Sequence, residues 1–246
     1  QVVAGLAFAL GSALVARIWA GHLSFVETNA WLPWATGLAA GIGRRHAVSW
    51  LAVVVGMMAL ANQPEIGIFS LWWLPLWALA GAWGHGQAQV VRALVRVGAG
   101  LAVGVGLAAF QIVPIFQLLS ISNRQASGMS WDFLTGASLP PWHLLGAIAP
   151  LAFGSPTGGY WPGPGYEWHE RLLYVGVVPL LAAAHLTGRW RRVCWGAALV
   201  AVALACGRYV PWYALTQWLP GYATLRIPSK HLTLASLALA LAAGLG

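Results

Sequence analysis

Long apolar runs joined by short connectors constrain this chain more than any other feature. Only 7% of the residues are charged, whereas a soluble domain carries about a quarter. A chain with so few charges lacks the side chains to cover a water-facing surface, so the runs predict membrane helices. The eight expected runs are 2–20, 28–43, 46–62, 66–84, 93–118, 172–187, 191–207 and 229–246. The sequence therefore predicts an all-α polytopic membrane protein, with residues 1–246 as a single transmembrane helical domain.

Several of these runs are shorter than the roughly 20 apolar residues that cross a bilayer, and 28–43, 172–187 and 191–207 are the weakest span predictions. Each is interpreted either as a half-span or as a helix shielded by its neighbours. Glycine pairs at four-residue spacing, Gly37 with Gly41 and Gly100 with Gly104, predict close approach between helices.

Basic residues occupy the connectors and set an expected orientation. The chain holds 13 Lys and Arg against 5 acids, and these basic residues cluster at 44–46, 92–96 and 189–192. If every run crosses, these three connectors lie on one side, which the positive-inside rule makes cytoplasmic together with both ends of the chain. Orientation explains the positive charge better than nucleic-acid binding does, so no nucleic-acid partner is expected. All five acids fall on the opposite, outer side: Glu27, Glu65, Asp132, Glu167 and Glu170.

One connector is long and polar, and it spans residues 118–171. In the expected orientation it is an extracytoplasmic loop. Its segment PPWHLLGAIAPLAFG is apolar but too short to cross a bilayer. We expect this segment to form a helix in the membrane interface anchored by Trp142, with a re-entrant half-helix as the alternative.

Basic residues on the outer side run against the positive-inside bias and therefore need a reason. Arginine binds phosphate through a planar fork of N–H donors. A lipid phosphate or pyrophosphate headgroup is thus one interpretation, and snorkelling with local ion pairs is the other. The four residues concerned are Arg124, Arg171, Arg226 and Lys230.

The outer acids are the weak candidates for a general base or a divalent-cation ligand. These are Glu65, Asp132, Glu167 and Glu170, and helix capping or local salt bridges are the alternatives for each. No spacing typical of a metal site, no P-loop and no nucleophile elbow occurs. No metal or other cofactor is therefore assigned, and binding of a divalent cation is kept as an alternative. Arg17, late in the first run, is expected to snorkel or to pair with Glu27.

Several segments in order resemble the YfhO-like family of bacterial membrane proteins, which belongs to the GT-C class of glycosyltransferases. The resemblance rests on GHLSFVETNAWLPW, NQPEIG, SNRQASGMSWDF, LPPWHLL, ERLLYVGVVPLLAA and CGRYVPWYALTQWLPGYATLRIPSKHLTL. Two motifs depart from the family pattern. Asn62 to Glu65 stands where the family has a G-H-P-E or G-H-P-Q turn, and Arg226 to Lys230 reads R-x-P-x-K where the family has R-x-P-x-R.

The resemblance implies sugar transfer on the outer face of a bacterial inner membrane. The donor would be a sugar linked to polyprenyl phosphate, and the acceptor a cell-envelope polymer or lipid. In GT-C enzymes the catalytic acid lies in the first outer loop, so the general base is expected upstream of Gln1. A non-catalytic subunit of a larger membrane complex is the alternative function, and a transporter of lipid-linked sugars ranks last because few polar residues lie at mid-membrane.

Overall fold

The computed structural model describes residues 2–120, 130–155, 157–159, 165–219 and 221–246. At 119–120 and 165–167 it describes the backbone but not the side chains. Over these residues the chain forms helices and turns, with one isolated antiparallel bridge between Ser155 and Gly159. The predicted all-α class is therefore confirmed. The chain divides into two compact units, residues 23–129 and residues 1–22 with 130–246. The prediction of a single domain stays a prediction.

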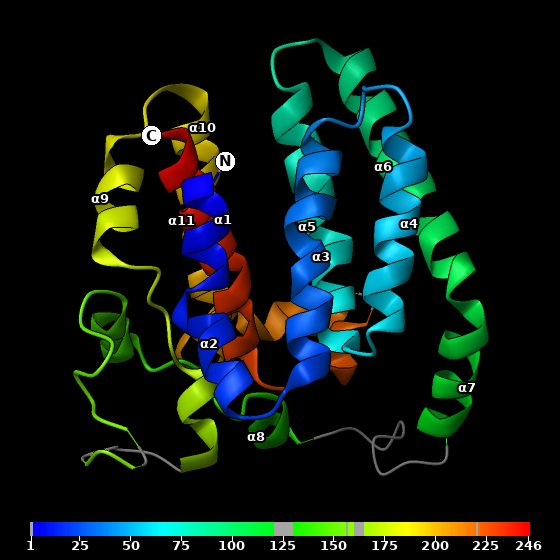
Figure 1. Cartoon of the computed structure of the whole chain (residues 1–246). Helices are drawn as coiled ribbons and strands as arrows, with labels where there is room; N and C mark the ends of the chain where they lie inside the picture. Colours follow the sequence, from blue (N-terminus) through cyan, green and yellow to red (C-terminus); the bar gives the residue numbers. More distant parts are fainter. Residues whose placement is uncertain (1, 121–129, 156, 160–164, 220) are drawn as a thin grey trace. The chain divides into compact units, whose positions relative to one another are not determined.

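The unit formed by residues 23–129 is a bundle of antiparallel helices (Figure 1). The helices are α3 (Leu23–Ala40), α4 (Ala47–Leu60), α5 (Pro64–Ala82), α6 (Gln87–Leu107) and α7 (Ala109–Ser120). Helix α3 packs on α4 and α5, and α6 packs on the same two helices. Leu32, Leu51, Ile66 and Leu74 are fully buried at the centre of this bundle. Alternation of direction brings the connectors 41–46 and 83–86 to one end and the connector 61–63 to the other.

Glycines let two of these helices approach closely. A Cβ on Gly100 would lie 2.9 Å from Leu51, and one on Gly104 would lie 2.7 Å from Val55, both on α4. The predicted packing role of this pair is confirmed. The other pair differs, because a Cβ on Gly37 would meet no atom within 4 Å and one on Gly41 would meet only its own turn and Arg44.

The fifth expected run is divided into α6 and α7 at Ala108. We expected Pro114 to kink or end this run, yet Pro114 lies inside α7 and the break precedes it by about one and a half turns. A proline ring displaces the carbonyl four residues earlier, here that of Phe110, so the strain falls in the turn just after the break.

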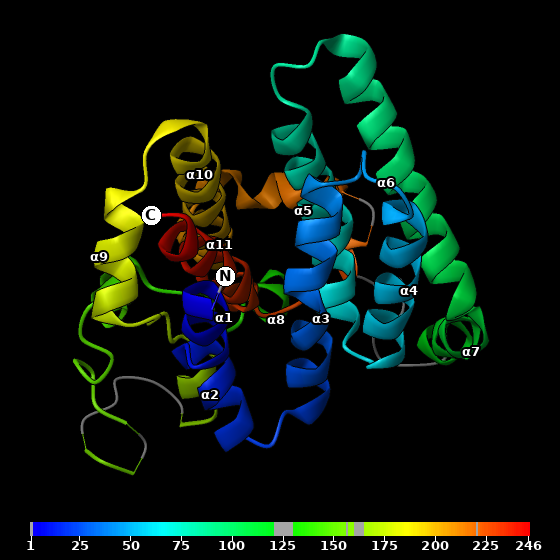
Figure 2. The same ribbon diagram turned by 45° about the horizontal axis from the view of Figure 1, so that its top comes forward.

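The other unit is built around α11 (Leu232–Leu245), which lies among α1 (Val2–Ala9), α9 (Val177–His185) and α10 (Gly188–Ala205) (Figure 2). These three helices pack against it, and its side chains are buried over most of its length. Helix α2 (Ser12–Trp19) continues α1 after a bend of 41°. The remaining helices are short: α8 (Trp131–Leu134), η1 (Pro141–Ala147), η2 (Gly165–Glu170), η3 (Gly207–Tyr209), η4 (Pro211–Trp218), η5 (Tyr222–Thr224) and η6 (Pro228–His231).

Two described helices, α5 and α6, are long and apolar enough to cross a membrane, and the bent pair α1–α2 makes a third if it is one span. Helices occur in all eight expected runs. The predicted number of eight crossings therefore stays a prediction. The apolar segment of the long loop forms only the seven-residue 3-10 helix η1, on which Trp142 is exposed.

Candidate functional site

Two backbone contacts align α2 with the segment that precedes α9. The N–H of Ser12 donates to the carbonyl oxygen of Tyr174 at 2.8 Å, and the N–H of Tyr174 donates to Oγ of Ser12 at 2.8 Å. Gly11 allows the bend itself, because a Cβ there would lie 2.9 Å from the carbonyl oxygen of Ala7. Arg17 follows Ser12 by about one and a half helical turns, and Glu170 precedes Tyr174 by four residues. The alignment thereby brings Arg17 beside Glu170.

Arg17 and Glu170 form a buried ion pair that joins residues 153 positions apart. Nη1 of Arg17 donates to Oε1 at 2.7 Å, and Nη2 donates to Oε2. The two side chains are 3% and 5% exposed. This planar, two-point arrangement is the strongest form of arginine–carboxylate pairing. Both charges are compensated, which explains how they persist in an apolar unit.

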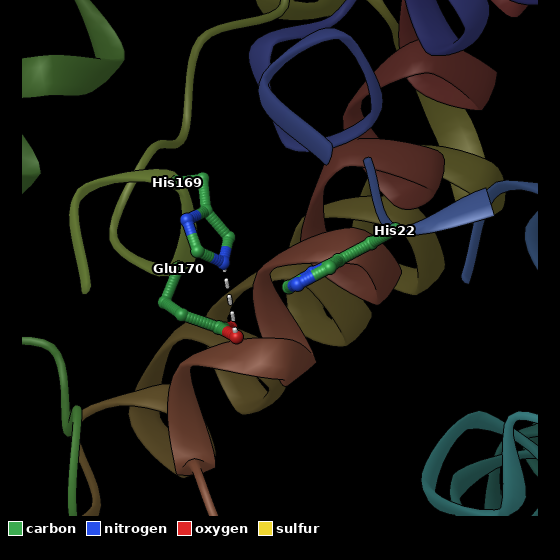
Figure 3. A group of neighbouring side chains, drawn as sticks. All are labelled: His22, His169 and Glu170. Carbon is green, nitrogen blue, oxygen red and sulfur yellow. Dashed lines mark ion pairs between the residues drawn. The ribbon is translucent and has the colours of Figure 1, made fainter. Parts of the chain in front are cut away.

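Two histidines join Arg17 and Glu170 in one group, of which Figure 3 shows His22, His169 and Glu170. His22, just beyond the end of α2, and His169 in η2 meet edge to face with ring centroids 4.7 Å apart. Nε2 of His169 lies 3.6 Å from Oε1 of Glu170, and Nη1 of Arg17 lies 3.1 Å from Nδ1 of His22. A guanidinium only donates, so Nδ1 of His22 accepts this bond and the proton of the neutral ring is on Nε2. We call Arg17, His22, His169 and Glu170, with Lys230, the ionic cluster.

The charges of the ionic cluster favour an ionised Glu170. Burial opposes ionisation, but the hydrogen-bonding His169 and the charges of Arg17 and Lys230 outweigh it, so the pKa of Glu170 is lowered. Partial burial and then the charge of Arg17 lower the pKa of His22, so its ring is neutral at pH 7. Among the described side chains, the cluster brings the cations of Arg17 and Lys230 to the carboxylate of Glu170. His22 is exposed, whereas the other four side chains are buried, so the cluster reaches the surface at His22.

The cluster also has the composition of a metal site. One ligand atom each from His22, His169 and Glu170 lies within 4.8 Å of the others, and two imidazoles with a carboxylate are a ligand set of zinc. Arg17, however, contacts both oxygens of Glu170 and donates to His22. A divalent cation would have to displace these bonds and would add two charges beside Arg17 and Lys230. The arrangement therefore suits an anion better than a dication.

The structure places three of the predicted phosphate-binding residues. Lys230, in η6, is 6% exposed and acts on Glu170 and His22 as part of the ionic cluster. Arg171 is half-buried and lies near His143, whose pKa is lowered to about 4 by burial and by this charge. Arg226 is half-buried with its guanidinium carbon 5.3 Å from the ring centre of Phe133. Arg124 lies outside the described residues.

The predicted acids have separate environments. Glu170 belongs to the ionic cluster. Glu65, in the other unit, is buried and accepts a 2.8 Å hydrogen bond from Nε2 of Gln63. Asp132 is largely exposed, with a carboxylate oxygen 3.5 Å from Nη2 of Arg208. The N-cap of α8 is Ser130, so Asp132 does not have the capping role that was one of its alternatives. The side chain of Glu167 lies outside the described part of the chain.

The expected pairing of Arg17 with Glu27 is wrong, because Arg17 pairs with Glu170. Neither histidine had been named from the sequence as a candidate site residue. The sequence signal for both was weak. His169 stands beside Glu170 in the E-x-H-E segment, and His22 stands five residues after a costly arginine in an apolar run.

Comparisons of the chain with protein-family models, with curated proteins and with solved structures find no match. The resemblance to the YfhO-like family accordingly stays a prediction.

Proposed function

We propose that the chain is a multi-pass helical protein of the bacterial inner membrane and that it transfers a sugar from a polyprenyl-phosphate donor on the outer face. One observation carries this proposal: an ionic cluster, buried except at His22, surrounds Arg17 of the apolar helix α2. Ionisable groups are costly at such positions and are characteristic of functional sites in membrane proteins. The resemblance of the ordered segments to a GT-C family supports the choice of reaction.

The ionic cluster contains cationic and N–H donor groups of the kind that stabilise a phosphate leaving group. In the proposed reaction the acceptor hydroxyl oxygen attacks the anomeric carbon. The bond from that carbon to the phosphate oxygen breaks, and the phosphate leaves with the electron pair. Lys230 and Arg17 stabilise the charge that develops on the phosphate, and Nε2–H of His22 donates to it from the exposed side.

Glu170 holds the cluster together and is not assigned as the general base. Its carboxylate is bound at both oxygens by Arg17, and its lowered pKa makes it a weak proton acceptor. A different group must take the proton of the acceptor hydroxyl.

A transfer assay tests the proposal. The full-length protein, in nanodiscs, is given a panel of polyprenyl-phosphate sugars and an extract of envelope acceptors. We expect transfer by the wild type and a loss of about two orders of magnitude in Lys230→Gln, typical of removing one transition-state donor. Lys230→Arg should retain part of the activity, and Arg191→Gln, on α10, is the control that should retain all of it.

Full transfer by Lys230→Gln at an unchanged unfolding temperature would remove Lys230 from the site.

A second candidate function is a non-catalytic subunit. Exposed apolar side chains on α6 and α7, among them Val95, Phe110 and Phe116, favour it, because a partner helix would cover them as well as lipid does. Absence of transfer with every donor, together with a stable membrane partner in the purified complex, would select this second function.

A further inference from the structure

A basic hollow lies at one end of the α3–α6 bundle, far along the chain from the ionic cluster. Two adjoining cavities of about 320 and 370 Å³ share Ile42, Gly43, Arg44 and Arg96. Their walls come from the connector 41–46, the end of α5 and the first turns of α6. The charged and polar residues around them are Arg44, Arg45, His46, His85, Gln89, Arg92 and Arg96. We call this the basic pocket.

No acid of this unit stands near the basic pocket. Residues 23–129 contain two acids, Glu27 and Glu65. Glu27 precedes the pocket end of α3 at Ala40 by about 20 Å of helix, and Glu65 precedes the pocket end of α5 at Ala82 by about 25 Å. Both acids therefore lie toward the end of the bundle opposite Arg44, Arg92 and Arg96. The positive charge at the pocket thus has no carboxylate of its own unit beside it.

The arginines are held in place and retain donors. Nε of Arg92 donates to the carbonyl of Ala88 at 3.2 Å, and Nη1 of Arg96 points to the carbonyl of Gly43 at 3.5 Å. Arg44 folds back over Gly41, where a Cβ would lie 3.2 Å from its Nε. Each guanidinium has five N–H donors, so these contacts leave most of them for a ligand. Arg92 and Arg96 are four residues apart and project from the same face of α6.

The pocket lies where both long apolar helices end. Helix α5 ends at Ala82 and α6 begins at Gln87, and these are the two described helices able to cross a membrane singly. Exposed Trp50 and Trp83 stand beside the pocket, the position of tryptophan at a bilayer interface. On α4, Trp50, Val53 and Met57 are exposed at helical spacing and form an apolar stripe that leads away from the pocket.

We infer that the basic pocket binds the phosphate headgroup of an anionic phospholipid on the cytoplasmic side of the membrane. Arginine forks from a connector and a helix match phosphate oxygens, and basic hollows between membrane helices on this side bind such headgroups. The apolar stripe on α4 provides a surface for an acyl chain, which a free phosphate compound would not need. The inference rests on the membrane location proposed above but not on sugar transfer.

Native mass spectrometry of the full-length protein tests this site. The protein is released from nanodiscs containing phosphatidylglycerol and phosphatidylcholine in equal amounts, and the retained lipid is identified. We expect the wild type to retain phosphatidylglycerol preferentially. Arg44→Gln with Arg96→Gln should weaken that preference by about thirtyfold, from the loss of two arginines at a charged surface. The control, Arg191→Gln with Arg192→Gln, removes two arginines from the start of α10 and should leave the preference unchanged.

Three results would overturn the site. The first is a preference for phosphatidylglycerol that survives in Arg44→Gln with Arg96→Gln. The second is an equal loss of that preference in the control pair. The third is that inorganic phosphate added alone displaces the lipid and stabilises the protein as well as phosphatidylglycerol does. The last result would assign the pocket to a soluble phosphate compound. If the double variant fails to fold, Arg92→Gln on the exposed rim of α6 gives the same readout with a smaller expected loss. Sugar transfer is measured in parallel, so failure of this site and failure of the proposed reaction are distinguished.

Discussion

The ionic cluster and the basic pocket use arginine in opposite ways. Arg17 is 3% exposed and binds both oxygens of a buried carboxylate, so its charge is part of the structure. Arg44 and Arg96 are exposed, stand far from the acids of their unit and contact backbone carbonyls or a glycine turn. A buried arginine must be compensated within the fold, whereas an exposed one leaves its charge for a ligand. The difference predicts that removing Arg17 lowers stability, whereas removing Arg44 or Arg96 lowers ligand binding.

The largest expected effect follows from removing the buried arginine. Arg17→Met should lower the free energy of unfolding by about 3–5 kcal/mol, because the carboxylate of Glu170 is then buried without its partner. Denaturant titration in detergent micelles measures this change. Replacing both partners, as Arg17→Met with Glu170→Leu, should recover most of the loss. A cost below about 1 kcal/mol for Arg17→Met alone would mean that the pair is not structural.

The wall of the basic pocket gives the next largest effect. Gly81 of α5 packs against the backbone of Ala40 of α3, and an added Cβ would collide with the carbonyl of Ala40. Gly81→Ala should therefore cost about 1–3 kcal/mol of unfolding free energy. Gly37→Ala is the matched control, because its Cβ meets no atom within 4 Å and alanine favours helix by up to about 1 kcal/mol. Equal effects of the two variants would refute the close approach of α3 and α5.

Acid should weaken the ionic cluster specifically. The pKa of Glu170 is lowered from its ordinary value of 4.5, so the unfolded chain takes up the proton first. The stability contributed by the carboxylate is then complete above about pH 5 and is lost as the pH falls through the folded pKa. Unfolding temperatures of the wild type and Glu170→Gln should differ at pH 7 and converge on acidification. A difference that stays constant down to pH 3 would contradict this assignment.

The smallest effect is expected from the charges of the basic pocket. Arg44→Gln should change the free energy of unfolding by no more than about 0.5 kcal/mol, because the side chain is exposed and supports no other residue. Its lipid preference should nevertheless fall. Thermal unfolding in nanodiscs with and without phosphatidylglycerol separates the two quantities. A large loss of stability in neutral lipid would assign Arg44 a structural role and erase the contrast with Arg17.

The positions of the helices were predictable from the sequence because helices form in the apolar runs. The end of the bundle at which Arg44, Arg92 and Arg96 meet was predictable too, since helices that alternate in direction bring alternate connectors together. The ionic cluster was not, because Arg17 and Glu170 are 153 residues apart and their pairing depends on the contact between Ser12 and Tyr174. Sequence proximity favoured Glu27 as the partner, and no local pattern identified the long-range contact.

Binding of polyprenyl phosphate tests the central claim most directly, namely that the ionic cluster binds a phosphate anion. Native mass spectrometry of the full-length protein compares polyprenyl phosphate with the uncharged polyprenol of the same length, for the wild type and for Lys230→Gln. The account predicts a preference of at least about tenfold for the phosphate, as expected for one charge-assisted contact, and its loss in the variant. Equal binding of the two lipids by the wild type, or an unchanged preference in Lys230→Gln, would contradict it.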